Sequence, residues 1–326
     1  MESCYSAPKL FSGLATLCIS HSELHTLSLH RRTTLQRLQR LHPHTLAPAV
    51  HFLSGSLPAP ALLHSHQYVL LHMVALLGPS NILHQHALYM LHHEVKDSWF
   101  VRLRLTSMQY SLPDPLQVLT SPLPKKKFKA MVKTAVQSFW HSALVAQAVP
   151  LTSLCYLRPT FLTLGNGPHP IWWTCGASPS AVRAATVQAK MLSGRYRSCW
   201  LRRHWTAESG ACRLPGCGVV PGDVAHLVSG LCPTLQPQLQ STLRNLENLL
   251  EPYPLLLPLL SGALKSDSQT ATTFILDPST DPSVIQLCQA YGHVSVLNPL
   301  FRACRAWIWA VHRTRMRLLG LCQYLE

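Results

Sequence analysis

Three cysteines and one histidine lie close together near the middle of the second half of the chain. Cys212, Cys217, His226 and Cys232 have the spacing Cys-x4-Cys-x8-His-x5-Cys. Structural zinc sites hold the ion with four such ligands in a tetrahedron, and one histidine with three cysteines is a recurrent set. Pro215 and Gly216 favour a turn that lets the first two thiolates face one ion. The spacing therefore predicts a closed, structural Zn²⁺ site, and a chance grouping in a chain with 11 cysteines and 19 histidines remains the alternative.

The other eight cysteines are scattered singly along the chain. Such scattering does not resemble a disulfide framework, so we expect a reducing, intracellular location, in the nucleus or the cytoplasm. The first residues make a poor signal peptide, and no apolar run reaches the length of a membrane span. We therefore expect no membrane partner.

Helical periodicity dominates the remaining sequence. Apolar residues recur at helical spacing in segments 22–42, 61–78, 81–95, 130–149, 236–250 and 299–320. Ser178 and Pro179 predict a further helix start, and that helix is expected to run to Trp205. Asp277-Pro278 and Asp281-Pro282 each predict a helix cap. In the final helix, Phe301, Cys304, Ile308 and Val311 are expected to form the packed stripe, and the chain is expected to be mostly α-helical.

Positive charge is in large excess, because 28 Lys and Arg residues face 13 Asp and Glu residues. A surplus of this size suits a polyanion, with nucleic acid as the first candidate. The candidate contacts are basic residues that interleave with aromatic ones or form runs: Arg195, Arg197, Arg202, Arg203, Arg302, Arg305, Arg313, Arg317, Lys125, Lys126 and Lys127. The alternative for each group is a solvated face with no partner.

Catalytic signatures are missing from the sequence. We find no Gly-x-Ser-x-Gly motif, no phosphate-binding Gly-x4-Gly-Lys motif and no adjacent aspartates for two divalent ions. The histidines of segments 61–95 have no cysteine or carboxylate partners at ligand spacing. We therefore expect no catalytic residues, no small-molecule substrate and no enzymatic activity.

Several stretches resemble the C-terminal region of animal non-LTR (LINE-type) retrotransposon reverse transcriptases. They are "PHPIWWTCGASPSAVRAATVQAKMLSGRYRSCWLRRHW", "CRLPGC" and "AHLVSGLCPTL", and looser similarity extends over nearly the whole chain. By position, the four clustered residues match the ligands of the family's CCHC zinc knuckle. The family more often has four residues between the histidine and the last cysteine, where this chain has five.

The resemblance implies a helical organisation in five regions. These are a thumb-like region (1–110), a Pro/Lys-rich linker (111–129), a helical region with an irregular Trp-rich segment (130–205), the zinc knuckle (206–234) and a C-terminal helical region with a basic last helix (235–326). It implies binding of RNA or DNA beside a polymerase palm, which this sequence does not contain, and hence a truncated, non-catalytic copy. Two alternatives remain: a protein-interaction scaffold that uses exposed Trp172, Trp173, Trp307 and Trp309, or a relic with no stable fold.

Overall fold

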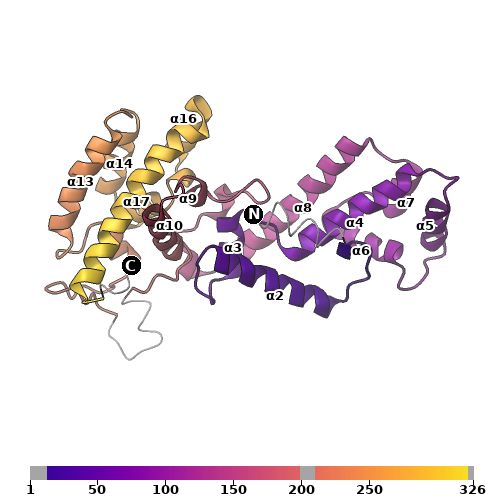
Figure 1. Cartoon of the computed structure of the whole chain (residues 1–326), viewed down its shortest axis with the longest axis horizontal. Coiled ribbons are helices and arrows are strands. Elements are labelled where there is room, and N and C mark those ends of the chain that lie inside the picture. Colours follow the sequence, from indigo (N-terminus) through magenta and orange to yellow (C-terminus); the bar gives the residue numbers. More distant parts are fainter. Residues whose placement is uncertain (1–12, 199–209, 322–326) are drawn as a thin grey trace. The chain divides into compact units, whose positions relative to one another are not determined.

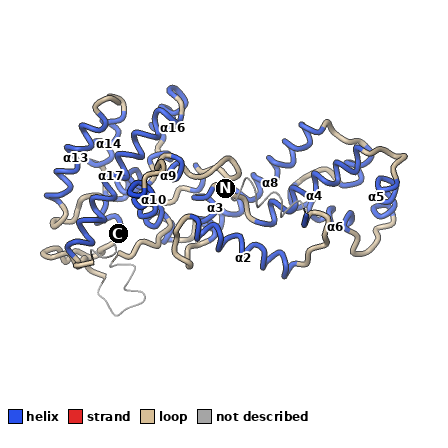
Figure 2. The backbone as a smooth tube through the Cα atoms, in the orientation of Figure 1, coloured by secondary structure: helices blue, strands red, loops and turns tan. Residues whose placement is uncertain are grey.

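The chain is mostly α-helical, as the sequence predicts. A computed structural model describes residues 13–198 and 210–321. Figure 2 shows helices joined by loops, and the described residues contain no strand. No described helix has both the length and the hydropathy of a membrane span.

The chain divides into two compact units. Unit 1 comprises Met1–Leu35, Gly55–Ala146 and Thr163–Asn166, and unit 2 comprises Gln36–Ser54, Gln147–Leu162 and Gly167–Glu326. These limits differ from the five regions expected from the sequence. The physical reason is that helices distant in the sequence share one core within each unit.

Unit 1 is a group of helices (Figure 1) with a main apolar core and a smaller apolar cluster around Ala59 and Leu63. It contains most of α2 (His21–Leu38), followed by α4 (Ala59–Leu76), α5 (Ile82–His92), α6 (Trp99–Tyr110), α7 (Pro115–Thr120) and most of α8 (Lys125–Ala148). The largest fully buried side chains of this core include Tyr68, Leu71, Leu91 and Phe128. Four of these helices, α2, α4, α5 and α8, were expected with ends within one to five residues of the observed ones, because their apolar stripes are long and regular.

The expected linker at 111–129 is instead part of this packed unit. Asp114 caps α7 by accepting a hydrogen bond from the backbone N–H of Leu116, and Pro115 occupies the first helical position. Val118 and Leu119 of α7 are buried in the same core as Phe128 of α8. The prolines were interpreted as linker residues, but two of them, Pro115 and Pro124, stand at the start of a helix, where proline is well tolerated.

Unit 2 is built around one long helix, α17 (His293–Leu318). The other helices are α3 (Ala47–Ser54), α9 (Pro170–Trp173), α10 (Pro179–Leu192), α12 (Val224–Val228), α13 (Gln236–Leu250), α14 (Leu256–Lys265), α15 (Ser268–Leu276) and α16 (Pro282–Tyr291), with short 3₁₀ turns at Thr152–Leu154, Pro159–Phe161 and Pro278–Thr280. Helices α10, α12, α13, α15 and α16 all pack against α17.

The packed stripe predicted for α17 is confirmed. Phe301, Cys304, Ile308 and Val311 are all fully buried. The helix begins earlier than expected, and Pro299 lies inside it rather than at its first turn. α17 is therefore the central element against which the rest of unit 2 is assembled.

The helix expected to reach Trp205 is shorter. α10 ends at Leu192, and Gly194 follows with φ +64. A Cβ atom at Gly194 would lie 1.9 Å from the carbonyl oxygen of Ser153, so the chain passes too close to its neighbour for any other residue. Arg195 and Arg197 therefore follow α10 instead of extending it. Arg202 and Arg203 lie outside the described residues.

Candidate metal centre and basic groove

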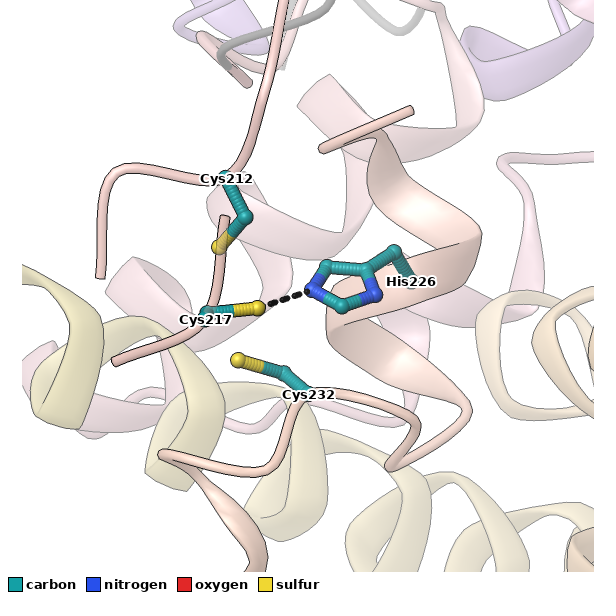
Figure 3. Close-up of side chains that lie close together, drawn as sticks. All are labelled: Cys212, Cys217, His226 and Cys232. Atoms are coloured by element: carbon teal, nitrogen blue, oxygen red, sulfur yellow. Dashed lines mark hydrogen bonds between the residues drawn. The ribbon is translucent and has the colours of Figure 1, made fainter. Parts of the chain in front are cut away.

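The four predicted ligands come together in unit 2. The Sγ atoms of Cys212, Cys217 and Cys232 and a ring nitrogen of His226 all lie within 4.8 Å of one another. Figure 3 shows these atoms turned toward one another, with Cys217 Sγ 3.2 Å from His226 Nε2. Two ligands come from the loop that begins at Gly210, the third from α12, and the fourth from the segment after α12.

A tight turn brings the first two cysteines to the same side. The backbone N–H of Cys217 donates to the carbonyl of Leu214 at 3.1 Å, and that of Cys212 donates to Val219 at 2.9 Å. Gly216 has φ +76, a conformation that glycine adopts without strain. The turn predicted from Pro215-Gly216 is thus present.

Gly222 closes the loop against its own start. Its N–H donates to the carbonyl of Gly210 at 2.9 Å. A Cβ atom here would lie 2.6 Å from the backbone nitrogen of Cys212, a distance that real Cβ atoms do not show. Only glycine fits this approach, so residue 222 fixes the position of the first ligand.

Helix α12 presents His226 to the thiols. Asp223 caps the helix, its side chain accepting a 2.8 Å hydrogen bond from the backbone N–H of His226 itself. All five residues of α12 are buried. The cap and the packing of α12 therefore fix the position of the His226 side chain.

The base of the cluster is tied to the surrounding helices. Thr234 Oγ1 donates to the carbonyl of Pro215 at 2.7 Å and so joins the segment after Cys232 to the first turn. Trp307 Nε1 on α17 donates to the carbonyl of Val228 at 2.8 Å, at the end of α12. Because of these contacts, the cluster is built into the helical core of unit 2.

The cluster could hold a metal ion. In a tetrahedral zinc site, Zn–S bonds of about 2.3 Å place the sulfur atoms about 3.8 Å apart, so the present separations need only small adjustments. Cys212, His226 and Cys232 are buried and Cys217 is half-buried. Burial raises the pKa of the Cys212 and Cys232 thiols and lowers that of the His226 imidazole. Four protein ligands and this burial are typical of a structural, closed site.

This cluster is the single group of three or more potential ligands found among the described residues. The histidines of α4 and α5 do not join one. His64 Nδ1 is hydrogen-bonded to the hydroxyl of Tyr110 at 2.8 Å, and His72 Nε2 to the carbonyl of Leu123 at 2.7 Å.

The sequence did not predict a buried pair formed by a histidine and an aspartate. His169 Nδ1 accepts from the backbone N–H of Ile171, so its Nε2 carries the hydrogen and donates to Asp277 at 3.0 Å. Ser279 donates to the other oxygen of Asp277 at 2.5 Å. Both aspartates stand at the N-cap position before a proline, as predicted, Asp277 at the 3₁₀ turn Pro278–Thr280 and Asp281 at α16. Only Asp281 makes the capping hydrogen bonds with its side chain, because the carboxylate of Asp277 is bonded to His169 and Ser279.

Three of the predicted basic residues line a groove between α13 and α17. Arg302, Arg313 and Arg317 are exposed, and Trp309 lies between them on the same face. The groove has a volume of about 480 Å³, and its α13 side is formed by Gln238, Thr242, Asn245, Leu246 and Leu249. None of the three guanidinium groups forms an ion pair with a described residue.

Arg305 does not share this face, contrary to the sequence-based expectation. It is buried and donates to both the hydroxyl and the carbonyl of Thr174, at 2.7 and 2.6 Å. Arg315 is buried as well and donates to Tyr196 Oη and to the carbonyl of Arg197. Both guanidinium groups join segments of the fold, so neither is a surface contact.

A second group of positive charges lies around the end of α10. Lys190 is half-buried, and burial followed by the charges of Arg197 and Arg40 lowers its pKa. Arg195 and Arg197 also contribute to lowering the pKa of His42, after burial and His44. The structure thus places Arg195 and Arg197 among other cations.

Lys125, Lys126 and Lys127 are exposed in the first turn of α8, in unit 1. Cations are unfavourable at the positive end of a helix dipole. No ion pair offsets this unfavourable placement, since the described part of the chain gives the three lysines no carboxylate partner.

Comparison with known proteins identifies no relative. No protein-family model matches the chain, and neither a curated protein nor a solved structure does.

Proposed function

We propose that this protein is a zinc-containing helical module that binds RNA or DNA through its phosphates. It would correspond to the region that follows the palm in reverse transcriptases of the non-LTR retrotransposon type. The proposal assigns no catalytic step to the chain. Zn²⁺ would be held by Cys212, Cys217, His226 and Cys232, and would stabilise the fold.

The observation that carries the binding proposal is a set of three arginines in one groove that have no ion-pair partner among the described residues. Arg302, Arg313 and Arg317 are exposed on one face of α17, and the described residues that line the groove include no acidic one. Guanidinium groups donate to phosphate oxygens in a fork geometry, and each phosphate that is neutralised releases counterions. A row of arginines that has no acidic neighbour in the described part of the chain therefore suits a polyanionic chain.

The positions of the four tryptophans give little support to the alternative of a protein-interaction scaffold. Trp307 is buried and hydrogen-bonded within unit 2, and Trp172 and Trp309 are half-buried. Trp173 alone of the four is exposed, at 39%. These side chains serve the fold of unit 2 or line the groove, so they do not form a common apolar surface.

Salt dependence of binding tests the proposal. The zinc-loaded chain would be titrated with a labelled 20-nucleotide RNA at several salt concentrations. Affinity is expected to fall with salt, by a log–log slope of about 0.7 per phosphate contacted on a single strand. Replacing Arg302, Arg313 and Arg317 together by glutamine is expected to lower that slope by about 2. Arg244→Gln, which changes an exposed arginine of α13 outside the groove, is the matched control.

Two results would overturn the proposal. One is an absence of binding at low salt by the folded, zinc-loaded chain. The other is binding that does not change with salt, because contacts that neutralise phosphates release counterions and make the affinity fall as salt rises.

A further inference from the structure

The groove between α13 and α17 contains an aromatic ring among its arginines. Seven residues of α17 line the groove: Arg302, Ala306, Trp309, Ala310, Arg313, Thr314 and Arg317. Successive members are separated by one, three or four residues, which places all seven side chains on one face of the helix. Figure 1 shows α13 and α17 lying side by side, and the two helices pack against each other.

The length of this face fits a nucleic-acid strand of a few nucleotides. Arg302 and Arg317 are 15 residues apart on α17. At 1.5 Å per residue, their Cα atoms are separated by about 22 Å along the axis. Trp309 lies about two turns from Arg302 and about one turn from Arg313. A strand in the groove would therefore meet positive charge on both sides of the ring.

The opposite wall of the groove is uncharged and mixes polar with apolar side chains. Gln238 and Asn245 of α13 contribute amide groups to the lining beside Leu246 and Leu249, and Glu247 of the same helix does not line it. Amides both donate and accept hydrogen bonds, which suits the edges of unpaired bases. Ala306 and Ala310 are the small neighbours of Trp309 on the groove face, so they leave space beside its ring.

The ring of Trp309 is supported from behind by His312. Their ring centroids are 5.5 Å apart with planes tilted by 35°. His312 is in turn held by Tyr196, whose hydroxyl lies 3.0 Å from Nδ1. Arg315 donates to the same hydroxyl oxygen at 3.2 Å and lies over the Tyr196 ring. The Tyr196 hydroxyl thus accepts from Arg315, which can only donate, and is hydrogen-bonded to His312 Nδ1 at the same time.

The supporting imidazole is uncharged at neutral pH. Burial, together with the charges of Arg315 and Lys190, lowers the pKa of His312 to about 4. One buried arginine, one tyrosine and one neutral histidine thus fix the orientation of Trp309. A ring that is already ordered loses little entropy when a base stacks on it.

We propose that this groove is a single-strand binding site, in which an unpaired base stacks on Trp309 while Arg302, Arg313 and Arg317 contact the flanking phosphates. This inference rests on the proposed function and names its ligand more closely. Stacking on tryptophan requires an exposed base face, which a duplex does not offer within its stack. The site would be tolerant of sequence, since every base has such a face.

Two substitutions at position 309 and a change of strandedness test the site. The full, zinc-loaded chain would be titrated with labelled 12-nucleotide oligo(U) and oligo(dT), and with a hairpin duplex of equal phosphate number. Trp309→Leu is expected to weaken single-strand binding by between about 5-fold and 100-fold and to leave duplex binding within about 2-fold. Trp309→Phe, which keeps a ring, is expected to retain most of the affinity. Trp173→Leu changes an exposed tryptophan of the same unit and serves as the control.

The outcomes separate this inference from the proposed function. If both strand types bind with normal salt dependence but Trp309→Leu binds like the wild type, the stacking site is overturned and phosphate binding stands. If no nucleic acid binds, both fail. If a polyglutamate peptide binds as tightly as the oligonucleotides and is insensitive to position 309, the groove is a general acidic-polymer site and the inference is wrong. Thermal unfolding and zinc content of Trp309→Leu would be measured beside binding, and loss of single-strand affinity counts in favour only if both match the wild type.

Discussion

Trp307 of α17 donates its indole N–H to the backbone carbonyl of Val228, the last residue of α12, at a distance of 2.8 Å. This bond joins the helix that lines the basic groove to the helix that carries the candidate metal ligand His226. Trp307 itself is buried. The candidate metal centre and the groove are therefore parts of one packed structure in unit 2, held together here by two residues that are 79 positions apart in the sequence.

Trp307→Phe tests this connection. Phenylalanine keeps the ring but leaves the buried carbonyl of Val228 without its donor, which typically costs about 1–3 kcal/mol. Urea unfolding of the zinc-loaded chain is the measurement, with Trp173→Phe as the exposed control. The connection would be refuted if the two variants unfolded with the same free energy as the wild type.

Gly222→Ala tests the loop that positions Cys212. The added Cβ would clash with backbone atoms of Cys212, so the loop must move and the first ligand with it. We expect a loss of stability of roughly 1–3 kcal/mol and weaker zinc retention against a chelator. Gly262→Ala is the matched control, because a Cβ there meets no atom within 4 Å and Gly262 lies within α14. The control is expected to be neutral or stabilising by up to about 1 kcal/mol.

Asp277→Ala and Asp281→Ala compare two aspartates in the same sequence context. Removing the buried Asp277 leaves His169 Nε2 and the hydroxyl of Ser279 without an acceptor. Leaving a buried donor such as His169 Nε2 without an acceptor costs about 1–3 kcal/mol, and the loss of the Ser279 hydrogen bond adds to this. Asp281 only caps α16, so its replacement should cost about 1 kcal/mol. Equal losses in thermal or urea unfolding would contradict the assignment.

These two aspartates show why part of the structure could be predicted and part could not. Local patterns were sufficient for α13, whose leucines repeat at helical spacing, and for the four metal ligands, which lie within one short stretch. Asp277 and Asp281 both precede proline, and nothing near them in the sequence distinguishes a buried acceptor from a cap. What distinguishes Asp277 is its hydrogen bond to His169, which is 108 residues away in the sequence.

Arg302 and Arg305 show that the sequence also does not determine which charged side chains are exposed. They are three residues apart on one helix, so the sequence placed both in a single basic stripe. Arg305 is buried because its partner Thr174, 131 residues distant, lies on its side of α17. The groove also could not be inferred, since it exists only where α13 packs beside α17.

His312 gives a pH dependence with a defined sign. Its pKa is lowered to about 4 in the folded chain, against 6.5 for the unperturbed side chain. Between these values the unfolded chain binds a proton that the folded chain does not, so stability is complete above about pH 6.5 and falls as the pH is lowered toward 4. His312→Gln removes this contribution. The difference in unfolding free energy between wild type and His312→Gln should therefore shrink as the pH falls from 7 to 5, and a difference independent of pH would contradict the lowered pKa.

Zinc content tests the metal centre most directly. Elemental analysis of the purified full chain would be made for the wild type, for Cys217→Ser with Cys232→Ser, and for the control Cys18→Ser with Cys155→Ser, both exposed cysteines outside the cluster. We expect about one zinc per chain in the wild type and the control. The cluster variant should hold none and should lose its cooperative unfolding transition, because structural zinc supplies about 10 kcal/mol or more of folding free energy. A wild-type chain that unfolds cooperatively yet takes up no zinc when one equivalent is supplied would contradict the metal centre.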